Sequence, residues 1–207
     1  MTRIEARCIA AWLLCGIFVA DRPSLNPRVE VSPQRCPNMK PIHFTTLPSP
    51  LGELTLTATD RGLCGLYFED HKYWPATRPT WHRDDGHRFD AARSWLANYF
   101  AGKKPEAMPA MDFVTGTEFQ RGVWKALQRI PAGQTRSYAK IAETIGRPKA
   151  VRAVGAAIGH NPMSIFVPCH RVIGSNGSLT GFAGGMDRKQ WLLAHEGAKG
   201  AWQHEAR

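Results

Sequence analysis

Apolar and polar side chains alternate along three short segments in the first third of the chain. These segments are His43–Thr45, Leu54–Ala58 and Leu63–Phe68, and residues that form turns separate them at 49–52 and 60–62. A period of two residues is typical of a strand that buries one face. Short turns between such strands favour antiparallel neighbours. The pattern therefore predicts a small antiparallel sheet.

From Phe89 onward the spacing of the apolar residues changes to that of helices. In Phe89–Phe100 the side chains of Trp95, Leu96 and Tyr99 fall on one face, as in an amphipathic helix. Four further helices are predicted, at Glu118–Ile130, Tyr138–Ile145, Pro148–Gly159 and Asp187–Glu196. The second half of the chain is therefore expected to be mostly helical.

The two helices on either side of Gly146 are short, and Ser137 precedes the first of them as a cap. Two short helices around a glycine turn are typical of a helix-turn-helix. The second helix has almost no bulky side chains, a pattern that a helix packed in a core also explains and that is the default interpretation. The basic residues Arg147, Lys149 and Arg152 favour instead a face that meets DNA.

Breaks in the pattern divide the chain into domains. Residues 71–88 are polar and are predicted to form a loop, and Gly102–Pro109 has the composition of a linker. At 207 residues the chain is long enough for two small domains. We expect an α+β protein with an α/β domain at 39–110, a mostly helical domain at 111–200 and a tail at 201–207.

The first 38 residues differ from the rest. Ile9–Ala20 is an apolar run that follows Arg3 and Arg7, which resembles the core of a signal peptide and is too short to span a bilayer with ease. A periplasmic or secreted protein is therefore one interpretation. Met39 opens the remainder as a natural start would, so our hypothesis is that residues 1–38 are a non-native or disordered upstream extension.

The net charge of +10 is concentrated in the second half of the chain. Between residues 119 and 188 ten bases stand against two acids; the bases are Arg121, Lys125, Arg129, Arg136, Lys140, Arg147, Lys149, Arg152, Arg171 and Arg188. Such an imbalance is typical of a module that binds a polyanion, although a solvated basic surface explains it equally well.

Five cysteines without paired spacing indicate neither a disulfide framework nor a zinc cluster. His71, His82 and His87 lie in a polar stretch without a neighbouring Cys-x-x-Cys, so we predict no metal ion. A reduced, cytoplasmic setting fits this use of cysteine best.

Cys169 differs from the other cysteines in its neighbours. It stands between Pro168 and His170, and a glycine-rich loop that contains Phe182 follows. A cysteine reacts as the thiolate, and His170 or Arg171 can supply the proton acceptor or the positive charge that this needs. The segment therefore indicates a nucleophilic thiol that faces a planar substrate. The remaining four cysteines, Cys8, Cys15, Cys36 and Cys64, are interpreted as structural.

The segment Val167-Pro-Cys-His-Arg-Val172 resembles the active-site signature of the O6-alkylguanine-DNA alkyltransferases, also called methylated-DNA–protein-cysteine methyltransferases. The resemblance continues, in order, through 117–124, 130–135, 137–139, 152–155, 161–162 and 192–197, and more weakly through 49–52 and 62–63. It covers roughly residues 39 to 200 and is of the bacterial type.

This resemblance implies a fold and a reaction. The fold is a ribonuclease-H-like N-terminal domain followed by a winged helix-turn-helix-type alkyltransferase domain. The reaction is single-turnover transfer of the alkyl group from O6-alkylguanine in double-stranded DNA to Cys169, with O4-alkylthymine as a second candidate substrate. It also implies DNA repair by a cytoplasmic monomer that uses no cofactor and meets no membrane.

The resemblance further implies a role for each residue of the site. Cys169 attacks the alkyl carbon, His170 takes the thiol proton through a water, Glu196 holds His170 in the useful tautomer, and Asn161 braces the turn that carries the site. Arg152 fills the place of the flipped guanine and Tyr138 presses the target phosphate outward. The other DNA-binding residues are Ser175, Ala139 and Arg147, and the pocket residues are Val172, Phe182, Ala183 and Gly184.

Three other functions stay open at this point. The first is a DNA-damage-binding protein that flips nucleotides without chemistry, which retention of Cys169 disfavours. The second is a winged-helix transcription regulator, and the third is a cysteine hydrolase, which the basic helix-turn-helix context makes the weakest.

Overall fold

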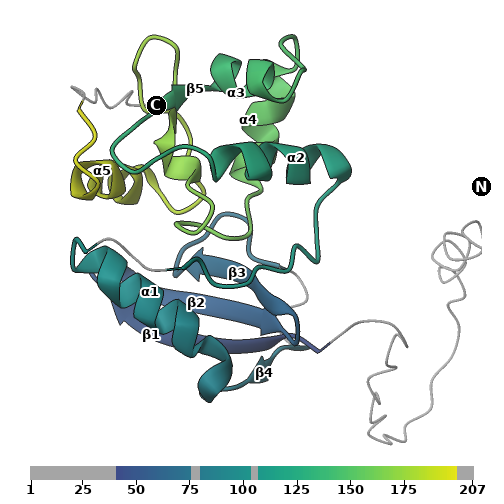
Figure 1. The fold of residues 1–207 in the computed structure, drawn as a ribbon, viewed down its shortest axis with the longest axis vertical. Helices are drawn as coiled ribbons and strands as arrows, with labels where there is room; N and C mark the ends of the chain where they lie inside the picture. The colour runs from purple at the N-terminus through teal and green to yellow at the C-terminus, as the bar shows by residue number, and fades with distance from the viewer. Residues whose placement is uncertain (1–40, 76–79, 104–106, 200–207) are drawn as a thin grey trace, which may run out of the picture. The chain divides into compact units, whose positions relative to one another are not determined.

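The computed structural model describes residues 41–75, 80–103 and 107–199 (Figure 1). The predictions for residues 1–38 and 201–207 lie outside the described residues. The described residues all belong to one unit, Lys40–Arg207. Within the described ranges, no helix is both long and apolar enough to cross a membrane.

The N-terminal part is built on a four-stranded sheet. Strands β1 (His43–Ser49), β2 (Gly52–Thr59) and β3 (Gly62–Phe68) form an antiparallel meander, as predicted, because two-residue turns join them. A fourth strand, β4 (His82–Arg83), pairs parallel to β1 and gives the order β3-β2-β1-β4. It lies in a segment that we predicted as loop, because two residues are too few to produce a period.

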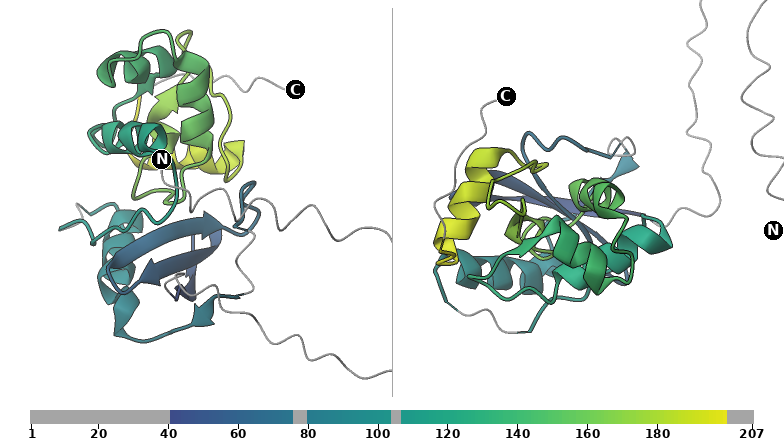
Figure 2. Two further views of the ribbon diagram at one scale, coloured as in Figure 1. Left: turned by 90° about the vertical axis from the view of Figure 1, so that its right-hand side faces the viewer. Right: turned by 90° about the horizontal axis from the view of Figure 1, so that it is seen from above.

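Helix α1 (Asp90–Phe100) lies across this sheet (Figure 2). A short 3-10 turn at residues 87–89 leads into it. Its buried residues are Ala92, Trp95, Leu96 and Tyr99, which is the apolar face expected from the sequence. Helix α1 thus covers one face of the sheet, and the apolar side chains between helix and sheet form the core of the N-terminal part.

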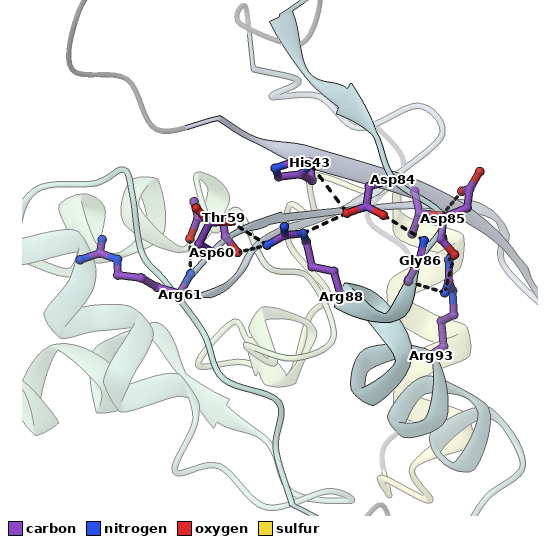
Figure 3. A network of polar contacts seen from close by, with 10 residues as sticks. His43, Thr59, Asp60, Arg61, Asp84, Asp85, Gly86, Arg88 and Arg93 are labelled. Carbon is purple, nitrogen blue, oxygen red and sulfur yellow. Dashed lines mark hydrogen bonds and ion pairs between the residues drawn. The ribbon is translucent and has the colours of Figure 1, made fainter.

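Exposed ion pairs hold the β4 loop against the start of α1 (Figure 3). Arg88 donates from Nε to Asp84 at 3.0 Å and from Nη1 to Asp60 at 3.0 Å, while Arg93 donates to the backbone oxygens of Asp85 and Gly86. Pairs of this exposure contribute little to stability. Their role is to fix the loop geometry, and none of these residues lies in the site described below.

The C-terminal part is mostly helical. Its elements are α2 (Glu118–Leu127), β5 (Arg136–Ser137), α3 (Tyr138–Thr144), α4 (Val151–Gly159), β6 (Val172–Ile173) and α5 (Met186–His195). Thr117 and Gln120 form a capping box at the start of α2, and Ser137 Oγ accepts from Lys140 N at the start of α3. Both starts follow from the sequence.

The pair α3 and α4 forms the expected helix-turn-helix, with one correction. Helix α4 begins at Val151 and not at Pro148, because Arg147–Ala150 forms a turn closed by Ala150 N donating to Arg147 O at 2.8 Å. Trp124 Nε1 donates to Ala157 O at 2.8 Å, so α2 packs on the buried face of α4. The small residues of α4 therefore serve the core on one face, while Arg152 is exposed on the other.

The segment that leads to Cys169 is attached to the N-terminal sheet. Leu66 N donates to Pro162 O at 2.8 Å, and Ser164 N donates to Leu66 O at 3.2 Å, so residues 162–164 run beside β3. The ring of Phe166 packs against Trp95 of α1 at 4.9 Å between centroids. The sheet and its helix thus position the backbone just before the thiol.

Candidate active site

A series of tight turns presents Cys169. Val167 N donates to Met163 O at 2.8 Å, and Cys169 begins a 3-10 turn that ends at Arg171. Ile165 is the only non-glycine residue with positive φ in the described ranges, at 69°. A buried β-branched residue in that conformation is strained, and such strain persists only where the surroundings enforce it. The neighbourhood of the thiol is therefore rigidly imposed by its packing.

Asn161 contacts the thiol directly. Its Nδ2 donates to Cys169 Sγ at 3.1 Å and to Val167 O at 2.9 Å, and its Oδ1 accepts from Met163 N at 3.0 Å. The side chain is 2% exposed. This geometry fits the bracing role expected of Asn161, and it adds a hydrogen bond to the sulfur that the sequence did not reveal.

The thiol is buried, with only 5% of Cys169 exposed. Burial raises the pKa of the Cys169 thiol, and the hydrogen bond from Asn161 and the positive charge of Lys189 offset only part of this effect. The resting side chain is therefore a protonated thiol at neutral pH. It needs a base before it can act as a nucleophile.

His170 and Glu196 form a buried pair beside it. His170 Nε2 lies 2.9 Å from Glu196 Oε1, and the two side chains are 0% and 2% exposed. Burial would raise the pKa of Glu196, but hydrogen bonds from His170 and Arg171 outweigh it and hold that pKa well below its usual range. Burial lowers the pKa of His170, against the pull of Glu196. The pair therefore rests as a carboxylate and a neutral imidazole.

These charge states fix the tautomer of His170. A carboxylate can only accept, so Nε2 carries the hydrogen that is donated to Glu196. The other ring nitrogen, Nδ1, then carries a lone pair, and it is buried with no hydrogen-bond partner among the residues that the structure describes. A buried, unpaired acceptor one residue from a buried thiol is the arrangement that a general base requires.

Arg171 also binds Glu196, in the bidentate manner that guanidinium and carboxylate favour. Its Nε donates to Oε2 and its Nη2 to Oε1, both at 2.7 Å, and its Nη1 donates to Ile130 O. Arg171 is thus engaged with Glu196 and holds that carboxylate in place, which leaves His170 as the candidate base.

Lys189 is a functional candidate that our sequence analysis missed. Its ammonium is fully buried and donates to Val172 O at 2.6 Å and Thr180 O at 2.8 Å. Burial lowers its pKa to about 8. The available sequence signal was its position three residues before Leu192, on the face of the closing helix that enters the core.

A cavity of about 480 Å³ opens beside the site. Its lining comes from α3, α4, the glycine-rich loop and the N-terminal part, and comprises Lys72, Tyr73, Tyr138, Val151, Gly155, Ala156, Gly159, His160, Thr180, Gly181, Phe182 and Ala183. The size is that of a small-molecule pocket. Tyr138 lines this cavity and Cys169 does not. The two side chains are nevertheless close, because a negative charge on Cys169 would raise the pKa of Tyr138.

The predicted pocket residues divide between this cavity and the core. Phe182 and Ala183 line the cavity, whereas Val172 and Gly184 do not. Val172 is fully buried in the β5–β6 pairing; its backbone N–H donates to Cys169 O, and its carbonyl accepts from Lys189. A Cβ at Gly184 would lie 2.3 Å from the ring of Phe68, so that glycine is required for packing.

The residues predicted to contact DNA lie around the cavity or on the surface. Tyr138 is half-buried, and its hydroxyl donates to Thr180 O at 3.3 Å. Arg147 and Arg152 are exposed around the second helix of the pair, and Ala139 is partly buried on the first. Ser175 is exposed on the loop before Leu179 and lies outside the cavity lining. Their contacts with DNA stay predictions.

The N-terminal part supplies one wall of the cavity, which the sequence did not indicate. Tyr73 stacks on His160 at the end of α4, with 4.3 Å between centroids, and Lys72 N donates to Ala183 O at 2.9 Å. Lys72 Nζ lies 5.5 Å from the centre of the Tyr73 ring. A cation and an aromatic pair thus border the opening.

Within the described ranges, no group of three or more histidine, cysteine or acidic side chains is placed to hold a metal ion. The fold and site together define a helix-turn-helix protein with a buried cysteine, a histidine–glutamate pair and an adjacent pocket.

Comparison with known proteins identifies the family. Residues 118–198 match the DNA-binding domain of 6-O-methylguanine DNA methyltransferase, and residues 42–108 match its ribonuclease-like domain. The methylated-DNA–protein-cysteine methyltransferase of Mycolicibacterium paratuberculosis is 52% identical over 155 residues, covering 75% of this chain and 92% of that relative. The chain belongs to the 6-O-methylguanine DNA methyltransferase family.

Solved structures agree with this assignment. The crystal structure of Mycobacterium tuberculosis O6-methylguanine methyltransferase aligns with a TM-score of 0.69 at 47% identity, covering 75% of this chain and 93% of that one. The same organism's protein in complex with DNA aligns at 0.70 and 49% identity, over 74% and 92%. The predicted two-part α+β fold is thereby confirmed.

Proposed function

We propose that this protein repairs DNA by moving the alkyl group of O6-alkylguanine in double-stranded DNA onto Cys169 in a single turnover. The observation that carries the proposal is the buried Cys169 thiol with Asn161 on its sulfur and the His170–Glu196 pair beside it, in a member of this family. O4-alkylthymine is a second candidate substrate, because it also carries its alkyl group on an exocyclic oxygen.

The chemistry is a displacement at carbon. His170 Nδ1 accepts the thiol proton through one water, and Glu196 stabilises the imidazolium that forms. The sulfur then forms a bond to the alkyl carbon while the bond from that carbon to O6 breaks and its electrons stay on the guanine. No oxidation state changes, so the reaction needs no cofactor. The product is a thioether, and none of the described residues beside Cys169 is suited to cleave it.

DNA recognition is assigned to α3, α4 and the cavity. A base in a duplex is out of reach of a thiol, so the nucleotide must be rotated out of the stack. We assign the cavity beside Tyr138 to the extruded base and the exposed Arg152 to the space that it leaves. Arg147, Ala139 and Ser175 are assigned to the DNA backbone. The basic C-terminal half supplies the attraction to phosphate.

The proposal assigns this work to one chain acting as a monomer, because the thiol, the base and the DNA-binding helices all come from the same chain. It also places the protein in the cytoplasm, where DNA is present and a thiol stays reduced. The alternatives are less favoured: neither a non-catalytic binder nor a transcription regulator needs a braced cysteine beside a histidine–glutamate pair.

The test is transfer of a labelled methyl group from a duplex that contains O6-methylguanine. We expect one methyl group per protein even with excess substrate, and mass spectrometry of peptides should place it on Cys169. Cys169→Ala should abolish transfer, whereas the matched variant Cys64→Ala should transfer normally. Repeated turnover, a label on another residue, or transfer by Cys169→Ala would each overturn the proposal.

A further inference from the structure

A tyrosine from the N-terminal part reaches the orienting carboxylate of the active site. Tyr99, in the last turn of α1, donates its hydroxyl to Glu196 Oε1 at 2.7 Å. Its own backbone oxygen accepts from His195 Nε2 at 2.7 Å, so the end of α1 is attached twice to the end of α5. The Tyr99 residue is 6% exposed.

Oε1 is the oxygen that also holds the base. It accepts from Tyr99 OH at 2.7 Å, from Arg171 Nη2 at 2.7 Å and from His170 Nε2 at 2.9 Å. The Glu196 side chain is 2% exposed, so these donors, with Arg171 Nε on Oε2, take the place of water. Three donors on one oxygen share its electron density, and each weakens the hold of that oxygen on the others.

We propose that Tyr99 is a positioning residue for alkyl transfer: its hydroxyl occupies Glu196 Oε1 and so limits how strongly that carboxylate stabilises a protonated His170. The inference rests on the proposed function, because it concerns the proton acceptor of that reaction. A base that is held too tightly in its protonated form cannot accept the thiol proton. Tyr99 thereby keeps the imidazole available at neutral pH.

The other charged groups around His170 are held in place by their own hydrogen bonds, so their effect on the pKa of His170 is the same in wild type and in Tyr99→Phe. Arg171, from the same turn, and Lys189, from α5, both disfavour a proton on His170, while Glu196 favours it. Arg171 is held by Glu196 and Ile130, and Lys189 by two carbonyls. The buried hydroxyl of Tyr99 stays protonated because burial and the nearby Glu196 raise its pKa. Removal of this one hydroxyl therefore changes one donor to Oε1 and no net charge.

The direction of the effect follows. Without the hydroxyl, Oε1 becomes a better acceptor for the imidazolium, so the pKa of His170 rises. We expect the loss of this one donor to raise the pKa of His170 by roughly one unit, a tenfold change that corresponds to about 1.4 kcal/mol. The rate of transfer should then fall about tenfold on the acidic limb of its pH profile and stay within about twofold on the alkaline plateau.

The experiment compares Tyr99→Phe with the wild-type protein and with Tyr67→Phe. Tyr67 is another buried tyrosine of the N-terminal part; it packs against Trp74 and Trp81, and none of its described contacts is with Glu196, so it controls for the loss of one tyrosine hydroxyl. The single-turnover rate with a methylated duplex is measured from pH 5 to 9, together with affinity for that duplex. We expect the acidic limb to move to higher pH in Tyr99→Phe alone, with unchanged affinity.

A loss of rate that is equal at every pH, or the same shift in Tyr67→Phe, would mean that the hydroxyl serves only to hold the fold and would overturn the inference. So would an unchanged profile. In a Glu196→Gln background, Tyr99→Phe should add no further shift, because the carboxylate through which it acts is gone.

An NMR titration separates this inference from the proposed function. The imidazole of His170, assigned by its loss in His170→Gln, is titrated in the full chain without DNA. The pKa should be higher in Tyr99→Phe than in the wild type whether or not alkyl transfer occurs. If the wild-type protein transfers no methyl group, the proposed function fails while this titration still decides the role of Tyr99.

Discussion

Replacement of Glu196 by glutamine should destabilise the protein and should do so in a pH-dependent way. The change keeps the shape of the side chain and removes its charge. The guanidinium of Arg171, whose side chain is 11% exposed, would then be left without its anionic partner. Removal of one partner from a buried ion pair costs about 3 to 5 kcal/mol. Because the glutamine oxygen can still accept one hydrogen bond, we expect the lower end, about 3 kcal/mol at pH 7.

The sign of the pH dependence follows from the depressed pKa of Glu196. The folded protein binds the Glu196 proton only at a pH well below the value for an unfolded chain, which is about 4.3. The contribution of the carboxylate to stability is therefore fully present above that unfolded value. It is lost as the pH falls toward the folded pKa. The difference in stability between wild type and variant should shrink below about pH 4.

Urea unfolding, followed by tryptophan fluorescence at pH 7 and at a series of acidic pH values, measures this difference. The matched control is Glu143→Gln, which removes the carboxylate of the exposed pair with Lys140. Exposed pairs of this kind contribute less than about 0.5 kcal/mol. Equal destabilisation by the two variants, or a gap that widens as the pH falls, would refute the assignment of a buried charge network at Glu196.

Two further predictions concern Lys189 and Arg152. Lys189→Met should lower the free energy of unfolding by about 1 to 3 kcal/mol, because Val172 O would lose the buried ammonium that it binds and Thr180 O would keep only the hydrogen bond from Tyr138. Burial lowers the pKa of Lys189 to about 8, so the wild type should gain stability as the pH rises from 8 toward the unfolded value of about 10.4. Lys189→Met should lack this gain. A gain of the same size in both proteins would contradict the assignment of a buried ammonium. Arg152→Ala should weaken binding to a methylated duplex and reduce by about one the slope of the logarithm of the binding constant against the logarithm of the salt concentration. Replacement of the exposed Arg83 by alanine should change neither the affinity nor this slope. Equal slopes for both variants would argue against a DNA-facing Arg152.

The elements that the sequence predicted are those with long periodic patterns. The alternation in 43–68 defined the meander, and the face of α1 was correct because Ala92, Leu96 and Tyr99 recur three or four residues apart. Strand β4 and the start of α4 were not predicted correctly. Strand β4 depends on its short pairing with the distant strand β1, and the start of α4 depends on the turn that Ala150 N closes with Arg147 O. Neither interaction produces a periodic pattern in the sequence.

The candidate site shows the same division. Cys169, His170 and Asn161 carry the family signature and lie within nine residues of each other, so local sequence was sufficient to select them. The partners Tyr99 and Tyr73 come from the other half of the chain. Tyr99 was predicted as a core residue from its spacing, which was correct for its ring. The partner of its hydroxyl is 97 residues away and is determined by tertiary packing alone.

The burial of Cys169 has a consequence for when the thiol reacts. With a raised pKa and 5% exposure, the resting sulfur is a poor target for solvent oxidants, which attack accessible thiolates. His170, the base in the proposed reaction, is buried as well. The cavity is lined by Tyr138 and not by the thiol, so the proposed reaction needs the alkyl carbon to reach a sulfur that lies outside the cavity lining. A protein that can react only once benefits from a nucleophile that stays inert until its substrate opens this path.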